Sequence, residues 1–381
     1  MVSRVVLFAN TDWYLYNFRR SLALALAQQG SEVFLLSPDG PYGEKLRTLG
    51  LNWRPVPMNR RSLNPLRELG LLLHLVGFFR SVRPSIVHGF TIKCAIYGAL
   101  AAKLARVPAR VSSVAGMGYV FTSNDLKARA LRPIVRWLIR TALGGKDARL
   151  VLQNFDDVRL FERSGLAKSE SIRLIRGSGV DCVRFSPVDA PLKQKPDIPS
   201  VLLAARLLWD KGIAEYVEAA RILRAQGRSV RFLLAGDPDP GNPAAIPVEK
   251  IQAWASENLI DWLGHVDDMA ALYARVDIVA LPSYREGLPK SLIEAAACGL
   301  PLIAANVPGC REVITDGVDG LLVPVRDDAA LAKAIAQLLD DPALAVRLGS
   351  SARAKALAEF EDRIVIDKTL GVYTELVTQA L

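Results

Sequence analysis

Short runs of β-branched and other apolar residues alternate with longer helical patterns along the whole chain. In the first half this alternation predicts strands at Val5–Asn10, Glu32–Pro38, Ser85–Phe90, Ala109–Gly116 and Ala148–Asn154. The helical patterns between them include Phe18–Gln29, Ile92–Ala105 and Leu126–Leu143. Strands and helices in regular alternation are typical of parallel sheets that carry helices on both faces, so the predicted fold class is α/β.

The alternation stops once, in a segment without apolar periodicity. Four prolines fall within Val183–Ser200, which is therefore the expected linker. The pattern then restarts with predicted strands at Val201–Arg206, Arg231–Asp237, Ile260–Gly264, Asp277–Ser283, Pro301–Asn306 and Gly320–Val325. Helices are predicted at Gly212–Gln226, Lys290–Cys298, Ala329–Leu339 and Ala343–Phe360.

A chain of 381 residues is long enough for two domains of this kind. We expect an N-terminal domain over residues 1–190 and a C-terminal domain over residues 200–362. A last helix, over residues 363–381, is expected to pack back on the N-terminal domain. Two doubly wound domains would face each other across a cleft at the carboxyl ends of their strands, and a ligand would bind there.

Charge is distributed unevenly along the chain. The formal net charge is +9, but residues 1–195 carry +17 and the remainder carries −8. Most single charges of this kind do no more than solvate helix faces. A separation of this size indicates instead that the first half meets an anionic partner, either nucleic acid or an acidic membrane surface.

Composition excludes several other classes of protein. Hydrophobic residues make up 51% of the chain, which excludes wholesale disorder. Four cysteines without a CxxC pair and three scattered histidines argue against a disulfide scaffold or a structural zinc site. No apolar run reaches the ~18 residues that span a bilayer, and the first twenty residues do not resemble a signal peptide. We expect a cytoplasmic protein, soluble or peripheral to a membrane.

The segment 281–314, LPSYREGLPKSLIEAAACGLPLIAANVPGCREVI, is the most informative part of the sequence. A predicted strand ends before a turn that contains Gly287 and Pro289, and a helix follows the turn. The unpaired amides at the start of that helix would form an anion site, while Glu286 and Glu294 flank it eight residues apart. Because carboxylates repel phosphate, we expect them to accept hydrogen bonds from sugar hydroxyls. The alternative is an ordinary turn and an amphipathic helix with solvated glutamates.

A second motif lies in the same predicted domain, where ARLLWDKG follows the first strand. Arg206 ends this strand and Lys211 stands just before the next helix. Two cations at such positions can hold a diphosphate, the arginine with a two-pronged guanidinium and the lysine as a point charge. Taken alone, they could equally be solvated cations in a loop.

Together the two motifs, Arg206 with Lys211–Gly212 and the segment EGLPKSLIEAAACGLP over 286–301, resemble the retaining glycosyltransferases of family 4, which have the GT-B fold. The resemblance covers essentially the whole chain, including GVDCVRF and the closing helix. Within the family, the segments YNFRRSLALAL and RSLNPL are most similar to members that extend polyprenyl-pyrophosphate-linked saccharides with an N-acetylhexosamine.

The resemblance implies a role for each motif residue. Arg206 and Lys211 would bind the donor diphosphate and stabilise it as a leaving group, with Glu286 on the transferred sugar. The donor-binding set would then be Arg206, Lys211, Gly287, Leu288 and Glu294, with Glu294 on the ribose and the amides of Gly287 and Leu288 on phosphate oxygens. The sugar would keep its anomeric configuration, and no divalent metal or other cofactor is expected. The implied donor is a UDP-sugar, with GDP as the alternative.

The acceptor side departs from the family pattern. Many relatives carry a histidine where this chain has Ala115, in the segment VAGMGY. The candidate acceptor-binding residues are Asn17, at the end of the aromatic loop Thr11–Asn17, together with His88, Lys93 and Gly116. For His88 a structural role is equally compatible with its place at a strand end, and the aromatic loop could equally be a packed element.

The segment Leu126–Arg149 interleaves basic and apolar side chains around Trp137. Its cations are Lys127, Arg129, Arg132, Arg136, Arg140, Lys146 and Arg149. A basic amphipathic helix with an interfacial tryptophan can lie on an anionic bilayer, here the inner face of the cytoplasmic membrane. It could also pack on the core alone, and the apolar run Leu66–Phe79 could extend this surface or belong to the core.

Two further patterns are weaker. Asp237 and Asp239 match the D-x-D metal motif of another glycosyltransferase fold, but a three-residue match is common by chance, so we expect no metal there. The run GMGYVF lacks the third glycine of a dinucleotide fingerprint. The leading function is thus sugar transfer from a nucleotide sugar to a polyprenyl-linked or other membrane-linked saccharide. A UDP-sugar epimerase of the same fold and a nucleic-acid-binding protein are the alternatives, although no helix-turn-helix or stacking aromatics support the latter.

Overall fold

The computed structural model describes residues 4–60, 62, 64–114, 126–187 and 198–380, without the side chains of 126–132, 134, 135 and 380. The chain divides into two compact units. Unit 1 comprises residues 1–179 and 363–381, and unit 2 comprises residues 180–362. The boundary at Gly179–Val180 precedes the segment that the sequence marks as the linker, because Val180, Cys182 and Phe185 are buried in the core of unit 2.

Unit 1 is built on a seven-stranded sheet with the order β3-β2-β1-β4-β5-β6-β7. All of its strand pairs are parallel. The strands are β1 (Arg4–Phe8), β2 (Glu32–Ser37), β3 (Asn52–Pro55), β4 (Ile86–Phe90), β5 (Ala109–Val114), β6 (Ala148–Leu152) and β7 (Ile172–Leu174). The short outer strands β3 and β7 were not predicted from the sequence.

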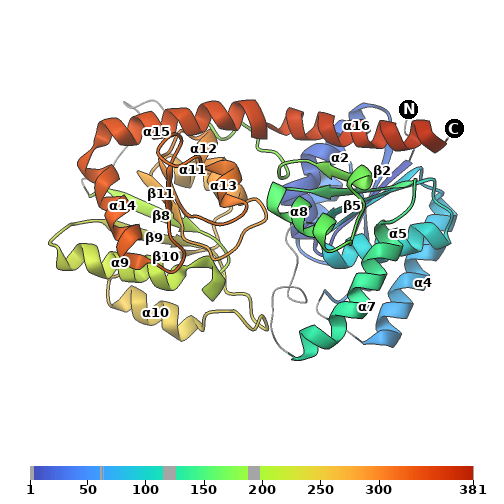
Figure 1. Cartoon of the computed structure of the whole chain (residues 1–381), viewed down its shortest axis with the longest axis horizontal. Helices are drawn as coiled ribbons and strands as arrows, with labels where there is room; N and C mark the ends of the chain where they lie inside the picture. Colours follow the sequence, from blue (N-terminus) through green and yellow to red (C-terminus); the bar gives the residue numbers. More distant parts are fainter. Residues whose placement is uncertain (1–3, 61, 63, 115–125, 188–197, 381) are drawn as a thin grey trace. The chain divides into compact units, whose positions relative to one another are not determined.

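Helices cover both faces of this sheet (Figure 1). They are α1 (Asp12–Tyr14), α2 (Arg20–Gln28), α3 (Tyr42–Thr48), α4 (Pro65–Val82), α5 (Ile92–Leu104), α7 (Leu126–Leu143), α8 (Phe155–Arg163) and α16 (Asp362–Ala380). Along β1, Val5 and Leu7 pack toward α2 and α16, while Val6 and Phe8 pack toward α4. The alternation of side chains along a strand thus supplies a separate apolar core on each face.

Unit 2 contains a six-stranded sheet with the order β10-β9-β8-β11-β12-β13, again parallel throughout. The strands are β8 (Ser200–Ala204), β9 (Arg231–Ala235), β10 (Asp261–Gly264), β11 (Ile278–Leu281), β12 (Leu302–Ala305) and β13 (Leu321–Val323). Its helices are α9 (Ile213–Ala225), α10 (Val248–Ser256), α11 (Met269–Tyr273), α12 (Lys290–Ala297), α13 (Cys310–Val313), α14 (Asp328–Asp340) and α15 (Pro342–Lys355). Both sheets thus have the Rossmann-like, doubly wound arrangement that the sequence predicts.

The last helix returns the chain to unit 1, where a carboxylate of α16 joins two strands. Glu375 accepts hydrogen bonds from Arg149 of β6 at 2.6 and 2.8 Å and from Arg173 of β7 at 2.5 and 3.1 Å. The Arg149 side chain is only 8% exposed, so Glu375 neutralises a charge that lies largely inside the protein. Arg149 is therefore not available to the basic surface that the sequence predicted for it. No described helix is long and apolar enough to cross a bilayer.

Replacing Glu375 with alanine should lower the free energy of unfolding by about 2–3 kcal/mol, because it leaves the Arg149 guanidinium buried without its carboxylate. Partial burial acts to raise the pKa of Glu375, but the hydrogen bonds from Arg173 and Arg149 lower it overall. The stabilisation is therefore complete above the ordinary carboxyl range and is lost as the pH falls through the lowered pKa. Urea denaturation at several pH values measures both effects. The matched control is Asp367→Ala, an exposed carboxylate on the same helix, which should change stability little.

Candidate functional site

The predicted donor residues lie in two loops of unit 2, one after β8 and one after β11. These strands are neighbours in the middle of the sheet, with β9 and β10 on one side and β12 and β13 on the other. The chain leaves β8 and β11 toward opposite sides, so this is the point in an open α/β sheet where the connections diverge and ligands bind. Arg206 and Lys211 follow β8, and Glu286 follows β11.

Lys211 and Glu286 form an ion pair that joins the two loops. The Lys211 Nζ atom donates to the Glu286 Oε1 atom at 2.6 Å, and the side chains are only 15% and 12% exposed. A pair so shielded from water is held more firmly than one on the surface. The structure thus brings together two of the three side chains that the sequence predicts for catalysis.

The backbones of the same two loops are also in contact. The amide of Tyr284 donates to the carbonyl of Asp210 at 2.9 Å. Gly212 has a φ of 72°, and a side chain at this position would collide with the carbonyl of Pro282. Glycine is therefore required where the loop after β8 passes the end of β11.

Arg206 is paired with an aspartate that follows β9. Its Nη1 atom lies 3.0 Å from the Asp239 Oδ2 atom, which also accepts from Asn242 at 3.0 Å. The Arg206 side chain is 61% exposed, whereas Asp239 is 9% exposed. Asp239 is thus occupied by an arginine, and the described residues contain no cluster of three or more metal-binding side chains.

Glu294 lies one turn into α12, and its carboxylate is largely buried. Burial raises its pKa, and the charges of Lys290 and Arg184 act in the opposite direction. The hydroxyl of Tyr273 donates to the carbonyl of Ser291 at 3.0 Å and lies 3.5 Å from the Glu294 carboxylate. Sequence analysis missed Tyr273, which the fold places beside Glu294 although the two are 21 residues apart.

The start of α12 carries no side-chain cap. Its N-cap residue is Pro289, which has no side-chain acceptor, and the amide of Leu288 donates to no described residue. The first turn of a helix exposes amides and a partial positive charge, so this end of α12 favours an anion. Leu288 and Gly287 immediately precede this helix end, and their predicted contacts with phosphate stay a prediction.

Tyr284 anchors the loop after β11, a role that no sequence pattern indicated. Its hydroxyl lies 2.6 Å from the Glu215 carboxylate of α9, and the guanidinium of Arg326 lies 4.6 Å from the centre of its ring. Burial and the hydrogen bond to Glu215 raise the pKa of Tyr284 to about 12. The phenol therefore stays protonated and keeps its bond to α9.

In unit 1 the structure supports the structural alternative for His88. The side chain is 1% exposed, and its ring nitrogens lie 2.6 Å from the Tyr373 hydroxyl and 2.7 Å from the Ser113 hydroxyl. Burial and the nearby charge of Arg19 hold its pKa well below the ordinary value, so the ring is neutral. Both ring nitrogens form hydrogen bonds inside the core, so His88 is a structural residue that helps to dock α16. Neither nitrogen is left to bind an acceptor saccharide.

Lys93 is likewise occupied by the protein itself. Its Nζ atom donates to the carbonyls of Asn59 and Ser62 at 2.8 and 3.0 Å and to Glu68 at 2.7 Å. These three hydrogen bonds use every N–H of the ammonium group, so Lys93 holds the segment before α4 in place. It has no N–H left to bind an acceptor saccharide.

The aromatic segment Thr11–Asn17 is helical, whereas the sequence predicted a loop. Thr11 caps α1, and the next turn, Leu15–Arg19, is a π-helix. Asn17 lies in this turn, donates to the carbonyl of Trp13 at 3.0 Å and is partly exposed. The buried carboxylate of Asp12 accepts from the amides of Tyr42 and Gly43 and fixes the segment against α3. Gly116 and Ala115 lie outside the described residues.

Comparison with known proteins identifies the family to which the chain belongs. Residues 4–144 match the family described as "Glycosyl transferase 4-like", and residues 198–341 match "Glycosyl transferases group 1". The chain is also 29% identical to an N,N'-diacetylbacillosaminyl-diphospho-undecaprenol alpha-1,3-N-acetylgalactosaminyltransferase of Campylobacter jejuni, over 98% of this chain and 99% of that protein. The chain belongs to the family-4 glycosyltransferases.

Two further similarities support this assignment. The glycosyltransferase is 25% identical to the UDP-Gal:alpha-D-GlcNAc-diphosphoundecaprenol alpha-1,3-galactosyltransferase of Escherichia coli, over 84% of this chain and 83% of that protein. Its fold matches Anabaena HepE, solved in complex with UDP, with a TM-score of 0.78 at 19% identity, over 97% of this chain and 99% of HepE. The fold of the glycosyltransferase is thus GT-B, with two Rossmann-like domains.

Gly309 should be essential to the shape of the donor site. It has a φ of 81°, and a side chain there would lie 2.6–2.7 Å from the carbonyls of Gly287 and Glu286. Gly309→Ala should therefore displace the turn at 286–287, lower the free energy of unfolding by more than ~1 kcal/mol and weaken nucleotide binding at least tenfold in calorimetry. Gly317→Ala is the matched control, since Gly317 has a φ of 73° but open space around it. Equal effects of the two substitutions would contradict this account.

Proposed function

We propose that this glycosyltransferase moves an N-acetylhexosamine from a UDP-sugar to a saccharide carried on undecaprenyl diphosphate, in the synthesis of a bacterial surface glycan. The observation that carries the proposal is the shielded Lys211–Glu286 pair, which places a cation and a carboxylate together beside the uncapped start of α12. A cation with helix amides suits a diphosphate, and a carboxylate suits sugar hydroxyls.

On the donor side, the diphosphate would lie against Lys211, Arg206 and the first amides of α12. In the structure both cations contact carboxylates, Glu286 and Asp239, so they are already oriented before a donor arrives. As the bond between sugar and phosphate breaks, negative charge grows on the leaving diphosphate. Fixed cations and amides stabilise this charge without reorganising, and we expect this to be their main contribution to the rate.

The two glutamates would bind hydroxyl groups. Glu286 would hold the transferred sugar and Glu294 the ribose of the nucleotide, where its raised pKa reflects the dry surroundings that strengthen such hydrogen bonds. Attack from the face that the leaving group vacates would retain the anomeric configuration. A phosphate oxygen would take the proton of the acceptor hydroxyl, so neither a protein base nor a divalent metal is required.

The acceptor and the donor nucleotide are inferred from the relatives. Two of them are named for acceptors linked to diphospho-undecaprenol, from C. jejuni and E. coli, and HepE was solved with UDP. An undecaprenyl chain stays in the bilayer, so the enzyme must work at a membrane surface. We place it on the inner face of the cytoplasmic membrane, where nucleotide sugars are available.

The outer face of α4 supports this membrane contact. Leu66, Leu69 and Leu73 are 79%, 52% and 61% exposed, whereas Leu71 and Leu75 on the inner face are buried. The sequence left open whether the apolar run Leu66–Phe79 belongs to the core or to the surface. In the structure one side of the run packs on the core, and the other side forms an apolar stripe on the surface. Such a stripe can enter the headgroup region of a bilayer.

The helix α7 adds a basic and aromatic contribution. It packs on α5, as α4 does (Figure 1). Arg136 is exposed, and Trp137 is 64% exposed, which suits an interfacial tryptophan beside an anionic lipid. Arg140 is exposed too, but it donates to the carbonyls of Gly165 and Ser164 and so also has a structural role.

Lys211→Gln and Glu286→Gln should each reduce turnover ~10²–10³-fold, because each removes a contact that matters most in the transition state. The assay incubates the purified enzyme with UDP- and GDP-sugars and an undecaprenyl-diphosphate saccharide, with excess EDTA, and identifies products by mass and by the anomeric coupling in NMR. We expect UDP-N-acetylhexosamine to react with retention, and the rate to persist in EDTA.

The matched controls are Lys333→Gln and Glu249→Gln, exposed charges of the same unit that should leave the rate unchanged. The double variant Lys211→Gln/Glu286→Gln leaves no unpaired charge, so it should fold and remain inactive. Normal turnover in this double variant would contradict the donor site. A strict need for magnesium or manganese would instead indicate that Asp237 and Asp239 bind a metal. Interconversion of UDP-sugars without an acceptor would identify an epimerase.

Leu69→Gln/Leu73→Gln should lower binding to vesicles that contain phosphatidylglycerol at least ~10-fold at every salt concentration, because the lost contact is apolar. Arg136→Gln should lower it ~5-fold at low salt and little at high salt, as one arginine near an anionic surface contributes ~1 kcal/mol that salt screens. Co-sedimentation with vesicles measures both.

The control for the leucines is Val318→Gln/Val346→Gln, two apolar side chains of unit 2 that are 53% and 68% exposed. If this pair weakens vesicle binding as much as the pair on α4, the stripe on α4 is not the docking surface. Turnover on a water-soluble acceptor should be the same in all of these variants.

A further inference from the structure

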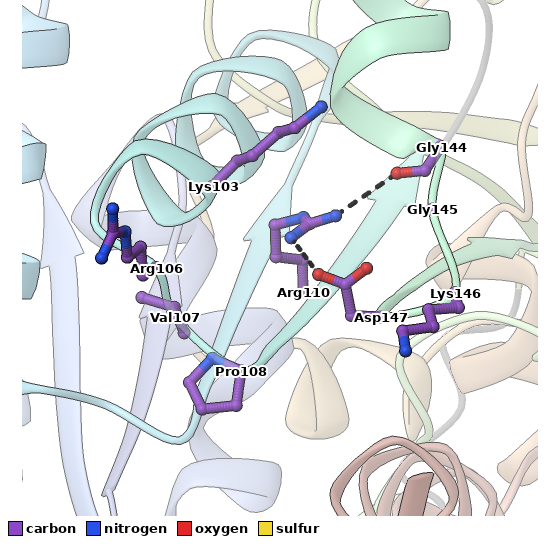
Figure 2. A pocket seen from close by; sticks show the side chains of 9 residues that line it. All are labelled: Lys103, Arg106, Val107, Pro108, Arg110, Gly144, Gly145, Lys146 and Asp147. Carbon is purple, nitrogen blue, oxygen red and sulfur yellow. Dashed lines mark hydrogen bonds and ion pairs between the residues drawn. The ribbon is translucent and has the colours of Figure 1, made fainter. Parts of the chain in front are cut away.

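A pocket of about 600 Å³ lies in unit 1 beside the amino ends of β5 and β6 (Figure 2). Its lining comes from two chain segments, 103–110 and 144–147, and includes four cationic side chains: Lys103, Arg106, Arg110 and Lys146. Asp147 is the only carboxylate that lines it. None of these residues belongs to the donor site, to the candidate acceptor residues or to the exposed faces of α4 and α7.

Arg110 is held rigidly at the centre of the lining. It is 3% exposed, and its Nη1 atom contacts the Asp147 Oδ2 atom at 2.6 Å while its Nη2 atom donates to the carbonyl of Gly144 at 3.3 Å. Figure 2 shows the guanidinium turned toward these two partners. Its Nε atom is buried and has no partner among the described residues. The arginine is therefore a positive group fixed in the wall of the pocket.

The other three cations form no direct ion pair, although the charge of Lys103 also helps to lower the pKa of Asp147. Lys103, Arg106 and Lys146 are exposed, and their side chains form no hydrogen bond or ion pair with a described residue. Asp147 is already engaged by Arg110. Its partial burial acts to raise its pKa, but the hydrogen bond and charge of Arg110 lower it overall, so it remains ionised. The pocket thus concentrates positive charge that the protein does not neutralise.

Helix dipoles explain only part of this arrangement. The helices α5 and α7 end at Leu104 and Leu143, beside the pocket, and the carboxyl end of a helix attracts cations with about half an elementary charge. Two such ends offset about one charge in total, which is fewer than the three unpaired cations. Like charges held together in one hollow repel one another, and an anion in the hollow would remove this cost.

We propose that this pocket binds the phosphate group of a small anionic ligand, separately from the donor site. A phosphate monoester offers several acceptor oxygens and up to two charges, which match the fixed guanidinium of Arg110 and the mobile ammonium groups of Lys103 and Lys146. The volume accommodates a phosphate with a further small group attached, within the usual range of small-molecule pockets. The phosphate could belong to a soluble metabolite or to a lipid headgroup, and both present the same chemistry.

The test uses the variant Lys103→Gln/Arg106→Gln/Lys146→Gln, in which every changed side chain is exposed. The probes are glycerol 3-phosphate in calorimetry, and vesicles of phosphatidic acid or phosphatidylglycerol at equal surface potential in flotation. The parent enzyme should bind glycerol 3-phosphate, phosphatidic acid vesicles or both, and the triple variant should bind them at least tenfold more weakly. Binding of glycerol 3-phosphate alone assigns a soluble ligand, and a preference for phosphatidic acid vesicles alone assigns a lipid headgroup.

Two controls separate this site from general charge and from the donor site. Arg54→Gln/Arg159→Gln/Arg163→Gln removes the same charge from exposed positions elsewhere in unit 1, and Lys211→Gln/Glu286→Gln alters the donor site. Both should bind the probes as the parent does, while the pocket variant should keep normal turnover on a water-soluble acceptor. The proposal is overturned if the pocket variant matches the charge control, or if the parent binds neither probe.

Discussion

The pairing of β8 with β11 is the constraint on which the proposed donor site depends. The two strands are 73 residues apart in the sequence but lie in parallel register, with Val201 opposite Ile278 and Leu202 opposite Val279. Because their carboxyl ends meet, the loops that follow them must meet as well, and every contact between Lys211 and Glu286 or between Asp210 and Tyr284 follows from that register. A shift of one residue would turn the buried side chains to the wrong face and separate the loops.

The charges of the site are balanced within the protein before any ligand is present. Lys211 faces Glu286, and Arg206 faces Asp239. Each pair offsets part of the desolvation free energy of its charged groups, and each holds a flexible side chain in one orientation. Under the proposed function, a diphosphate would compete with these carboxylates, which would favour ligands with more than one negative charge over singly charged ones.

The candidate donor motifs were predicted to lie at strand ends, because strand ends are readable from apolar runs and glycines. The structure confirms that placement, and the roles of the residues stay a prediction. Sequence reasoning could not give their partners. Asp239, Tyr273 and Tyr284 reach the site through the strand order, which local patterns do not encode. For His88 the sequence left a structural role open, and the buried hydrogen bonds of its ring support that role. Lys93 was a candidate for the acceptor side, but its ammonium group is bonded to two backbone carbonyls and to Glu68, which local patterns do not encode. The strands β3 and β7 escaped detection because they are only four and three residues long.

The return of α16 to unit 1 has a consequence for how the protein is made. Unit 1 contains residues 1–179 and also residues 363–381, so all of unit 2 is inserted within it along the chain. On the ribosome the first sheet emerges early, but Tyr373 and Glu375 are synthesised only after all of unit 2. During this interval His88 and Arg149 lack their partners, while unit 2 already has every residue of its own sheet. Unit 2 can therefore complete its fold first, and unit 1 is finished only after α16 has been synthesised.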